Sequence, residues 1–354
     1  MPAGCTRIDA GGQVVTAGLV DPFTALGLIE IGLEPSTNDQ DLRAPFQDSE
    51  KQIRAAVRTS LGYQPLSAVI PVARTGGVTS AIVKPSGGVV SGTGFWVDLA
   101  GARQADAIVR DPVAMFAQLG GASRTTGMFV LDTALREAVA WPKAKAAWQR
   151  AAHAPFGTPH LDLDALQPVV TGKIPLVVEV NRAADIEGLL AMTRDLPIRL
   201  VIVGGAEAWC VKELLAARRV PVVLDGLRFG PADFDSLRAR PDAAKLLIEA
   251  GVPVMFSTFD GHMARKLRQV AGNAVREGMP RAAALNAVTR VPAEAFGLAN
   301  RGQIAAGFVA NLVVWSGDPF ELSTRVSHML IRGREVALTS RQSVLRERYR
   351  VIGP

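Results

Sequence analysis

Three residues, Lys84, Glu179 and Asp260, lie at the ends of apolar runs that predict strands, and their side chains could perform acid–base chemistry. A buried lysine beside a carboxylate can have its pKa shifted far enough to move protons without a metal ion. The more common arrangement of such a pair is a structural salt bridge, so Lys84 and Glu179 have two interpretations. The predicted catalytic residues are therefore Asp260, Glu179 and Lys84.

Asp260 also has two interpretations. It could act as the general acid or base of the site, or it could cap the helix that begins near His262, since an aspartate before a helix accepts free backbone N–H groups. Of the four histidines only His262 is expected at this edge, because His153 and His160 flank a loop and His328 belongs to a terminal β segment. The sequence leaves both roles of Asp260 open.

Zinc sites usually take three or more nitrogen, sulfur or oxygen donors from the protein. Glu179, Asp260 and His262 are the one set available near the predicted opening, and His262 would have to turn inward from a helix start. We therefore predict a pocket without metal ligands. If an ion binds, we expect one divalent metal such as zinc at Glu179 and Asp260.

Further residues are expected to line the same opening, because they follow strand ends or lie on the first predicted strand. These pocket residues are Phe23, Ala25, Asn181, Arg182, Gly204, Asp225 and His262.

The elements that position these residues alternate between short apolar runs and longer amphipathic segments. Apolar runs that predict buried parallel strands cover residues 77–84, 175–180, 198–204, 221–224 and 253–258, with Val14–Asp21 before them and one further candidate inside 103–150. Helices are expected at 131–153, 183–195, 206–218, 241–250, 263–278 and 280–297. About seven or eight such units favour a (β/α)8 barrel in the α/β class. No Gly-x-Gly-x-x-Gly opens a helix after the first strand, which disfavours dinucleotide binding.

The pattern changes after residue 300. Residues 302–319 and 326–336 alternate and turn as β-hairpins do, which predicts a small β module, and Arg341–Arg350 predicts a basic helical end. That end is the one concentration of basic residues in a chain of formal charge +6, and no nucleic-acid recognition module accompanies it. We predict no nucleic acid and, without an apolar run of 18 residues, no membrane partner.

Composition agrees with a globular protein. The chain has 354 residues, of which 48% are hydrophobic, enough for a large barrel core and excluding a disordered chain.

Several motifs resemble the amidohydrolase superfamily, in particular its imidazolonepropionase-like branch. They are Val15–Asp21, Ser86–Gly94, Ala287–Glu294 and the Gly-x-Ile-x-x-Gly block that begins at Gly302, in family order. The resemblance implies a metal-dependent hydrolase of C–N bonds with its site at the carboxyl ends of the barrel strands. The glycine-rich stretch Ser86–Gly94 is interpreted as a structural turn that could also hold an anion with its N–H groups.

The resemblance also implies a His-x-His pair at the end of the first strand, where this chain has Phe23 and Ala25. A third histidine is replaced by Glu179 and a fourth by Gly204. Neither Phe23 nor Ala25 offers a lone pair to a metal ion. We therefore expect a degenerate metal site.

The family also has a β-sandwich built from residues before and after the barrel. The expected division is residues 1–13 as a sandwich remnant, 14–299 as the barrel and 300–354 as the C-terminal β module and tail.

The functional prediction is an amidohydrolase-like protein that is catalytically impaired, or a non-catalytic binding or partner subunit. The alternative is an active hydrolase of cyclic amides, dipeptides or related bonds, with an atypical metal site or none. Expected partners are a small-molecule ligand and a second copy in a homodimer, or a related intact hydrolase. As written the chain is expected in the cytoplasm, or in the periplasm if a signal has been lost.

Overall fold

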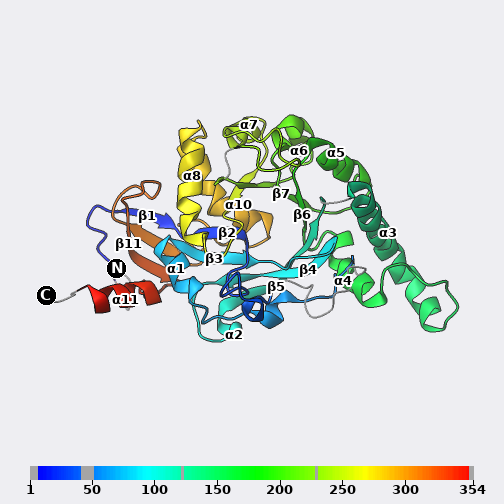
Figure 1. Ribbon diagram of the computed structural model, residues 1–354, viewed down its shortest axis with the longest axis horizontal. Helices are drawn as coiled ribbons and strands as arrows, with labels where there is room; N and C mark the ends of the chain where they lie inside the picture. Colours follow the sequence, from blue (N-terminus) through cyan, green and yellow to red (C-terminus); the bar gives the residue numbers. More distant parts are fainter. Residues whose placement is uncertain (1–6, 41–51, 121–122, 228–229, 351–354) are drawn as a thin grey trace.

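The computed structural model describes residues 7–40, 52–120, 123–227 and 230–350. Its centre is an eight-stranded sheet that curves into a nearly closed barrel, and a separate sheet of four strands lies beside it (Figure 1). The prediction of a TIM-like barrel with a small additional β module is confirmed.

The barrel strands pair with their neighbours in chain order. They are β2 (Leu19–Thr24), β3 (Val78–Val83), β4 (Val90–Asp98), β5 (Ile108–Gln118), β6 (Leu176–Val180), β7 (Leu200–Gly204), β8 (Val222–Asp225) and β9 (Val254–Ser257). Pairing is parallel except at β4, which runs antiparallel to both β3 and β5. The carboxyl ends of seven strands therefore meet at one end of the barrel.

The antiparallel strand β4 corrects one prediction. The stretch Ser86–Gly94 was interpreted as a glycine-rich turn, but only its first residues turn, and the chain is extended and paired from Val90 onward. Gly94 lies so close to its neighbours that an added Cβ would come within 2.4 Å of the Phe116 ring. Gly94 therefore serves close strand packing, and anion binding by the turn before it stays a prediction.

Helices cover the outside of the barrel, as Figure 1 shows for α3 and α5 to α8. The α-helices are α1 (Val69–Thr75), α2 (Gln104–Ala107), α3 (Arg124–Gln149), α4 (His160–Val170), α5 (Ala183–Met192), α6 (Lys212–Ala217), α7 (Ala243–Glu249), α8 (Leu267–Arg276), α9 (Arg281–Ala287), α10 (Arg290–Ala295) and α11 (Arg341–Tyr349). Short 3-10 turns are η1 (Pro35–Thr37), η2 (Thr59–Gly62), η3 (Ala208–Val211) and η4 (Ala264–Lys266). The predicted C-terminal helix is thus present as α11.

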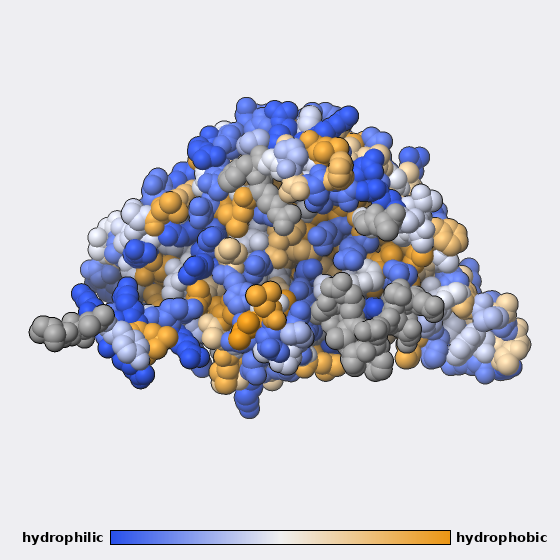
Figure 2. All heavy atoms as spheres, in the orientation of Figure 1, coloured by the Kyte–Doolittle hydropathy of each residue, from blue (hydrophilic) through white to orange (hydrophobic). Residues whose placement is uncertain are grey.

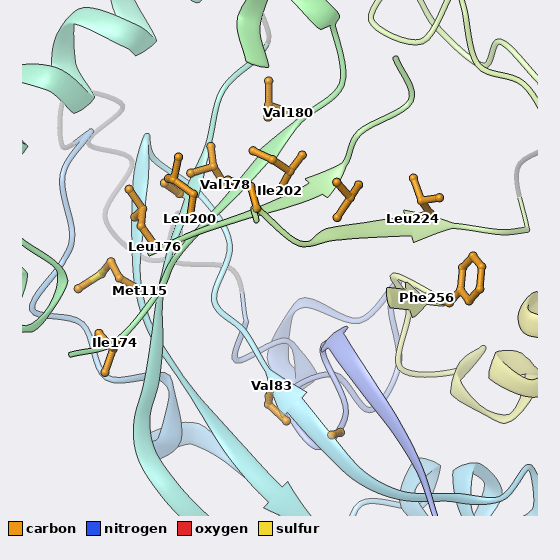
Figure 3. Packing of buried hydrophobic residues seen from close by; sticks show 14 of the residues in the cluster. Val83, Met115, Ile174, Leu176, Val178, Val180, Leu200, Ile202, Leu224 and Phe256 are labelled. Atoms are coloured by element: carbon orange, nitrogen blue, oxygen red, sulfur yellow. The ribbon is translucent and has the colours of Figure 1, made fainter. Parts of the chain in front are cut away.

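Alternate strand residues build two separate layers of core. Leu176, Val178 and Val180 of β6 pack outward with Leu200 and Ile202 of β7, in the layer between strands and helices (Figure 3). The residues between them face the interior of the barrel. That interior cluster contains Val20, Phe23, Ile82, Trp96, Val113, Ala114, Phe116, Val177, Val201, Val203, Val223 and Met255. Ala293 of α10, and Phe296 and Leu298 just after it, belong to the same cluster. A period of two along each strand produces this division.

The small sheet has the order β1 (Val14–Ala17), β10 (Leu312–Trp315), β11 (Val326–Ile331) and β12 (Arg334–Glu335). The single strand expected from Val14 to Asp21 is therefore wrong: the chain divides at Gly18 into β1, which pairs with β10, and β2, which enters the barrel. An added Cβ at Gly18 would lie 2.1 Å from Thr79 Oγ1, so a glycine is needed where the chain changes sheets. The predicted domain boundaries stay predictions, and residues 1–6 of the first segment lie outside the described residues.

A buried polar network ties the barrel to the small sheet. Asp98 at the end of β4 is fully buried, and its Oδ1 accepts hydrogen bonds from Ser80 Oγ at 2.8 Å, Arg301 Nη1 at 2.7 Å and Asn311 Nδ2 at 3.2 Å. Asn311 Oδ1 in turn accepts the Arg332 N–H of the turn after β11. The network fixes the orientation of the two sheets.

Hydrophilic residues predominate over the upper helices of the face in Figure 2, and hydrophobic residues show in smaller groups between them. Among the helices of the described residues, none is long and apolar enough to cross a membrane.

Candidate functional site

A cavity of about 290 Å³ opens at the carboxyl ends of the barrel strands. Its lining includes Phe23, Lys84, Glu179, Asn181, Gly204, Leu224, Asp225, Phe256 and Phe259, together with residues of the segment 230–241 and of helix α8. Six predicted pocket or catalytic residues are therefore brought together: Phe23, Lys84, Glu179, Asn181, Gly204 and Asp225.

The period of two explains why the charged members point into this cavity. Lys84, Glu179 and Asp225 each lie two residues beyond an interior residue of their strand, which are Ile82, Val177 and Val223. Each polar side chain therefore continues the interior row where the strand reaches the barrel mouth.

Aromatic rings fill the floor of the cavity. The Phe23 ring centroid lies 5.0 Å from that of Phe259 and 6.1 Å from that of Phe116. The ammonium group of Lys84 lies over the Phe23 ring, 4.4 Å from its centroid, as in a cation–π contact. The predicted first-ligand position thus holds a packed ring with a cation above it.

Lys84 and Glu179 do not form the expected salt bridge. In the described part of the chain, no ion pair or hydrogen bond joins either side chain to another residue. Burial lowers the pKa of the Lys84 ammonium, and the negative charge of Glu179 partly opposes that shift. The structure therefore places a lysine and a carboxylate in one cavity with both heads left available.

Gly204 and Asn181 form one unit at the ends of β6 and β7. Gly204 has a left-handed backbone, with φ at +85°, and an added Cβ would lie 2.4 Å from Asn181 Oδ1. The same oxygen accepts the backbone N–H of Ala206 at 3.4 Å. Asn181 thus occupies the space that any side chain at position 204 would need.

The segment 230–241 after β8 lines the outer part of the cavity with Asp233, Ser236 and Arg240. The Trp209 indole N–H donates to the Arg238 carbonyl at 2.9 Å, which holds the segment against the barrel. Sequence reasoning missed these residues, because a loop between a strand and a helix carries no periodic signal of where it folds.

Four predicted residues lie elsewhere. Asp260 is exposed and accepts the His262 backbone N–H at 2.7 Å within a turn, and His262 itself is exposed. The expected helix cap is wrong, because η4 has Met263 at its N-cap and α8 has Lys266. Ala25 is buried but does not line the cavity. Arg182 borders a separate surface depression with Phe234 and Leu237.

The turn after β9 accounts for the outward position of Asp260. Phe259 has a left-handed backbone, with φ at +58°, an uncommon conformation for a bulky residue. It turns its ring toward the cavity and sends the next residue away from it. The sequence carried no signal for this turn.

Asp21 is a further residue near the site that the sequence analysis did not predict. It is fully buried on β2, and its carboxylate accepts hydrogen bonds from Ser257 Oγ and from Thr258 Oγ1, the latter at 2.9 Å. Burial raises the pKa of Asp21 to about 6, although these hydrogen bonds and that from the Phe23 N–H act in the opposite direction. Asp21 lies beneath the cavity and joins the first barrel strand to the last.

The donor atoms at the mouth do not fit the metal that the family resemblance implies. Phe23, Ala25 and Gly204 supply no donor atom, and Glu179 supplies one carboxylate. Asp260, its expected partner in a metal site, is not in the cavity. Within the described residues, no group of three or more His, Cys, Asp or Glu side chains is arranged to hold an ion.

Comparisons with known proteins agree on the family. The model of the amidohydrolase family matches residues 25–337. Amidohydrolase tasK of Hapsidospora irregularis is 25% identical over 375 residues, which cover 94% of this chain and 37% of that protein. The chain therefore spans little more than a third of the length of this curated relative.

Solved structures share the fold. An amidohydrolase from Thermotoga maritima MSB8 superposes with a TM-score of 0.85 at 24% identity, covering 95% of this chain and 90% of that one. A β-aspartyl dipeptidase from Fervidobacterium islandicum AW-1 gives a TM-score of 0.53 at 14% identity, covering 92% and 85%.

Proposed function

The chain belongs to the amidohydrolase family, and we propose that its barrel mouth binds a small polar organic molecule without a catalytic metal ion. Hydrolysis of C–N bonds by a metal-activated water is then absent or strongly impaired. The protein acts in this proposal as a binding subunit built on a hydrolase barrel.

The contact between Lys84 and Phe23 carries this proposal. A divalent cation at the first-ligand position would meet the Phe23 ring where it needs a lone pair, and the Lys84 ammonium where it needs negative charge. Of the four positions where the resemblance implies histidines, only that of Glu179 carries a donor atom, whereas a usual catalytic zinc site has three protein ligands. Among the described residues, no three His, Cys, Asp or Glu side chains are arranged to hold an ion.

The cavity keeps the properties of a ligand site. It combines an apolar floor with a few polar groups that converge from different strands, as small-molecule sites do. Lys84 at the end of β3, and Glu179 and Asn181 at the end of β6, can donate or accept hydrogen bonds toward a ligand. A ligand carrying both a donor and an acceptor would satisfy the two charged heads together.

An active hydrolase is the second candidate. The cavity retains a lysine and a carboxylate that could exchange a proton, which supports metal-free attack on an amide, lactam or dipeptide bond. A hydrolysis screen of such compounds with and without chelator separates the candidates. Turnover that survives the chelator supports this second candidate, whereas turnover that the chelator abolishes contradicts the metal-free mouth.

The proposal is tested by metal analysis of the purified chain before and after incubation with zinc, manganese and nickel. We expect far less than one ion per chain, and the same content in the Glu179→Gln variant. Stoichiometric metal that disappears in Glu179→Gln would overturn the proposal. Glu187→Gln, on the outer helix α5, serves as the matched control for a lost carboxylate.

A further inference from the structure

The amine of Lys84 is available for chemistry. No hydrogen bond or ion pair joins its side chain to another described residue, and the amine lines the cavity above the Phe23 ring. An amine in an apolar, partly buried place is a recognised setting for nucleophilic catalysis through a Schiff base. A structural lysine at such a depth would be expected to have a paired carboxylate.

We infer that Lys84 forms a Schiff base with a small, uncharged aldehyde or ketone that binds in the barrel mouth. The inference rests on the proposed ligand-binding function and names its substrate class. Lys84 Nζ is the nucleophile and Glu179 transfers the proton.

The step balances within the cavity. Glu179 takes a proton from the Lys84 ammonium, and the free amine adds to the carbonyl carbon, which breaks the C=O π bond and forms a C–N bond. A proton moves from nitrogen to oxygen and gives a carbinolamine. Glu179 then returns its proton to the hydroxyl group, which leaves as water while the nitrogen lone pair forms the iminium. The net change is ammonium plus carbonyl to iminium plus water, with no oxidant or reductant.

Burial supports the first part of this step. Desolvation lowers the pKa of Lys84, so a larger fraction of the amine is neutral at a given pH than for a lysine in water. The negative charge of Glu179 limits the shift and keeps a proton acceptor in the same cavity.

The charges of the lining select an uncharged carbonyl compound. Glu179, Asp225 and Asp233 line the cavity with Lys84 and Arg240, and the Arg240 guanidinium is already paired with Asp242. The negative charge of Glu179 near Lys84 disfavours the added negative charge of a keto acid. A cavity of about 290 Å³ limits the ligand to a small molecule.

Reductive trapping tests the inference. The chain is incubated with dihydroxyacetone or glyceraldehyde and sodium cyanoborohydride, and the adduct is located by peptide mass spectrometry. We expect one principal adduct, at Lys84, formed several-fold faster than adducts at exposed lysines, and slower labelling with pyruvate. The Lys84→Arg variant keeps the positive charge but cannot form a Schiff base, so the principal adduct should be absent from it.

Lys145→Met is the matched control, because Lys145 lies on the outer helix α3 in an ion pair with Asp164 and should not contribute. Glu179→Gln should slow the trapping reaction, and the principal adduct should remain at Lys84. Circular dichroism of Lys84→Arg shows whether the variant is folded, and labelling of the wild-type chain remains a test if it is not. Adducts spread over surface lysines with none at Lys84 would overturn the inference.

Metal analysis of the same samples separates this outcome from failure of the proposed function. A metal-free chain without a Lys84 adduct refutes only the Schiff base. A stoichiometric metal that Glu179→Gln removes refutes the metal-free mouth, whatever the labelling shows.

Discussion

The carboxylate of Asp21 on β2 accepts a hydrogen bond from the hydroxyl of Thr258, just beyond β9, at 2.9 Å. β2 and β9 are the first and last strands of the eight-stranded sheet, and they are not paired with each other. Side-chain hydrogen bonds therefore connect the two edges of the sheet. Ser257 Oγ adds bonds to the same carboxylate and to the Phe23 carbonyl at 2.7 Å. The first and last strands, which both contribute to the cavity floor, are thereby held together.

This relationship predicts a pH-dependent stability. Because burial raises the pKa of Asp21 from 3.8 to about 6, the folded state binds the Asp21 proton more tightly than the unfolded state does. The stabilisation that this proton gives to the folded state is fully present below pH 3.8 and is lost as pH rises through about 6. The loss corresponds to about 3 kcal/mol. Asp21→Asn removes this titration, so urea unfolding from pH 4 to 7 should show the wild-type free energy falling relative to the variant. Parallel curves would contradict the assignment.

The pair of Gly204 and Asn181 predicts a steric effect at the cavity. Gly204→Ala places a Cβ against Asn181 Oδ1 on a left-handed backbone, and should lower the free energy of unfolding by about 2 to 4 kcal/mol. Gly251→Ala is the matched control, because Gly251 has a similar φ of +84° but nothing within 4 Å of the added Cβ, and should cost about 1 kcal/mol. Equal losses in thermal and urea unfolding would mean that Asn181 moves away freely.

The Asp98 network predicts a large loss of stability far from the cavity. Asp98→Ala leaves the buried Arg301 guanidinium without its carboxylate, and should cost about 3 to 5 kcal/mol in urea unfolding. Asp106→Ala breaks an exposed ion pair with Arg103 and should have only a small effect. Similar effects of the two substitutions would show that the network does not hold the sheets together.

The edge of the small sheet predicts a homodimer. Within the described residues β1 pairs with β10 alone, and Val14 and Val15 are 39% and 42% exposed, so a second copy is expected to cover them. Light scattering after size exclusion should give a dimer mass, and Val15→Lys should give a monomer. Leu33→Lys, at a fully exposed site away from this sheet, should stay dimeric. A monomeric wild-type chain would refute the proposal.

The sequence predicted the part of the site that follows from strand periodicity. The sequence predicts Lys84, Glu179 and Asp225 at strand ends. Because side chains alternate along a strand, each of the three points into the barrel mouth. Position along a strand is a local property, so one sequence is enough to predict it.

What the sequence did not predict depends on tertiary contacts. The division at Gly18 depends on the approach of Thr79, and the outward position of Asp260 depends on the left-handed turn at Phe259. The salt bridge expected between Lys84 and Glu179 does not form, and the Lys84 ammonium lies over the Phe23 ring. None of these contacts has a local pattern in the chain.

The space around Gly204 sets a limit on protein engineering. Histidines introduced at positions 23, 25 and 204 would not by themselves create a zinc enzyme. Position 25 lies outside the cavity, and a side chain at position 204 would collide with the neighbouring Asn181 amide. A designer would have to rebuild the backbone at the end of β7, relocate Asn181 and remove the ammonium together. An exchange at position 204 alone would lose stability before any catalytic gain appeared. If the proposed Schiff base forms, this barrel offers a better starting point for amine catalysis than for metal chemistry.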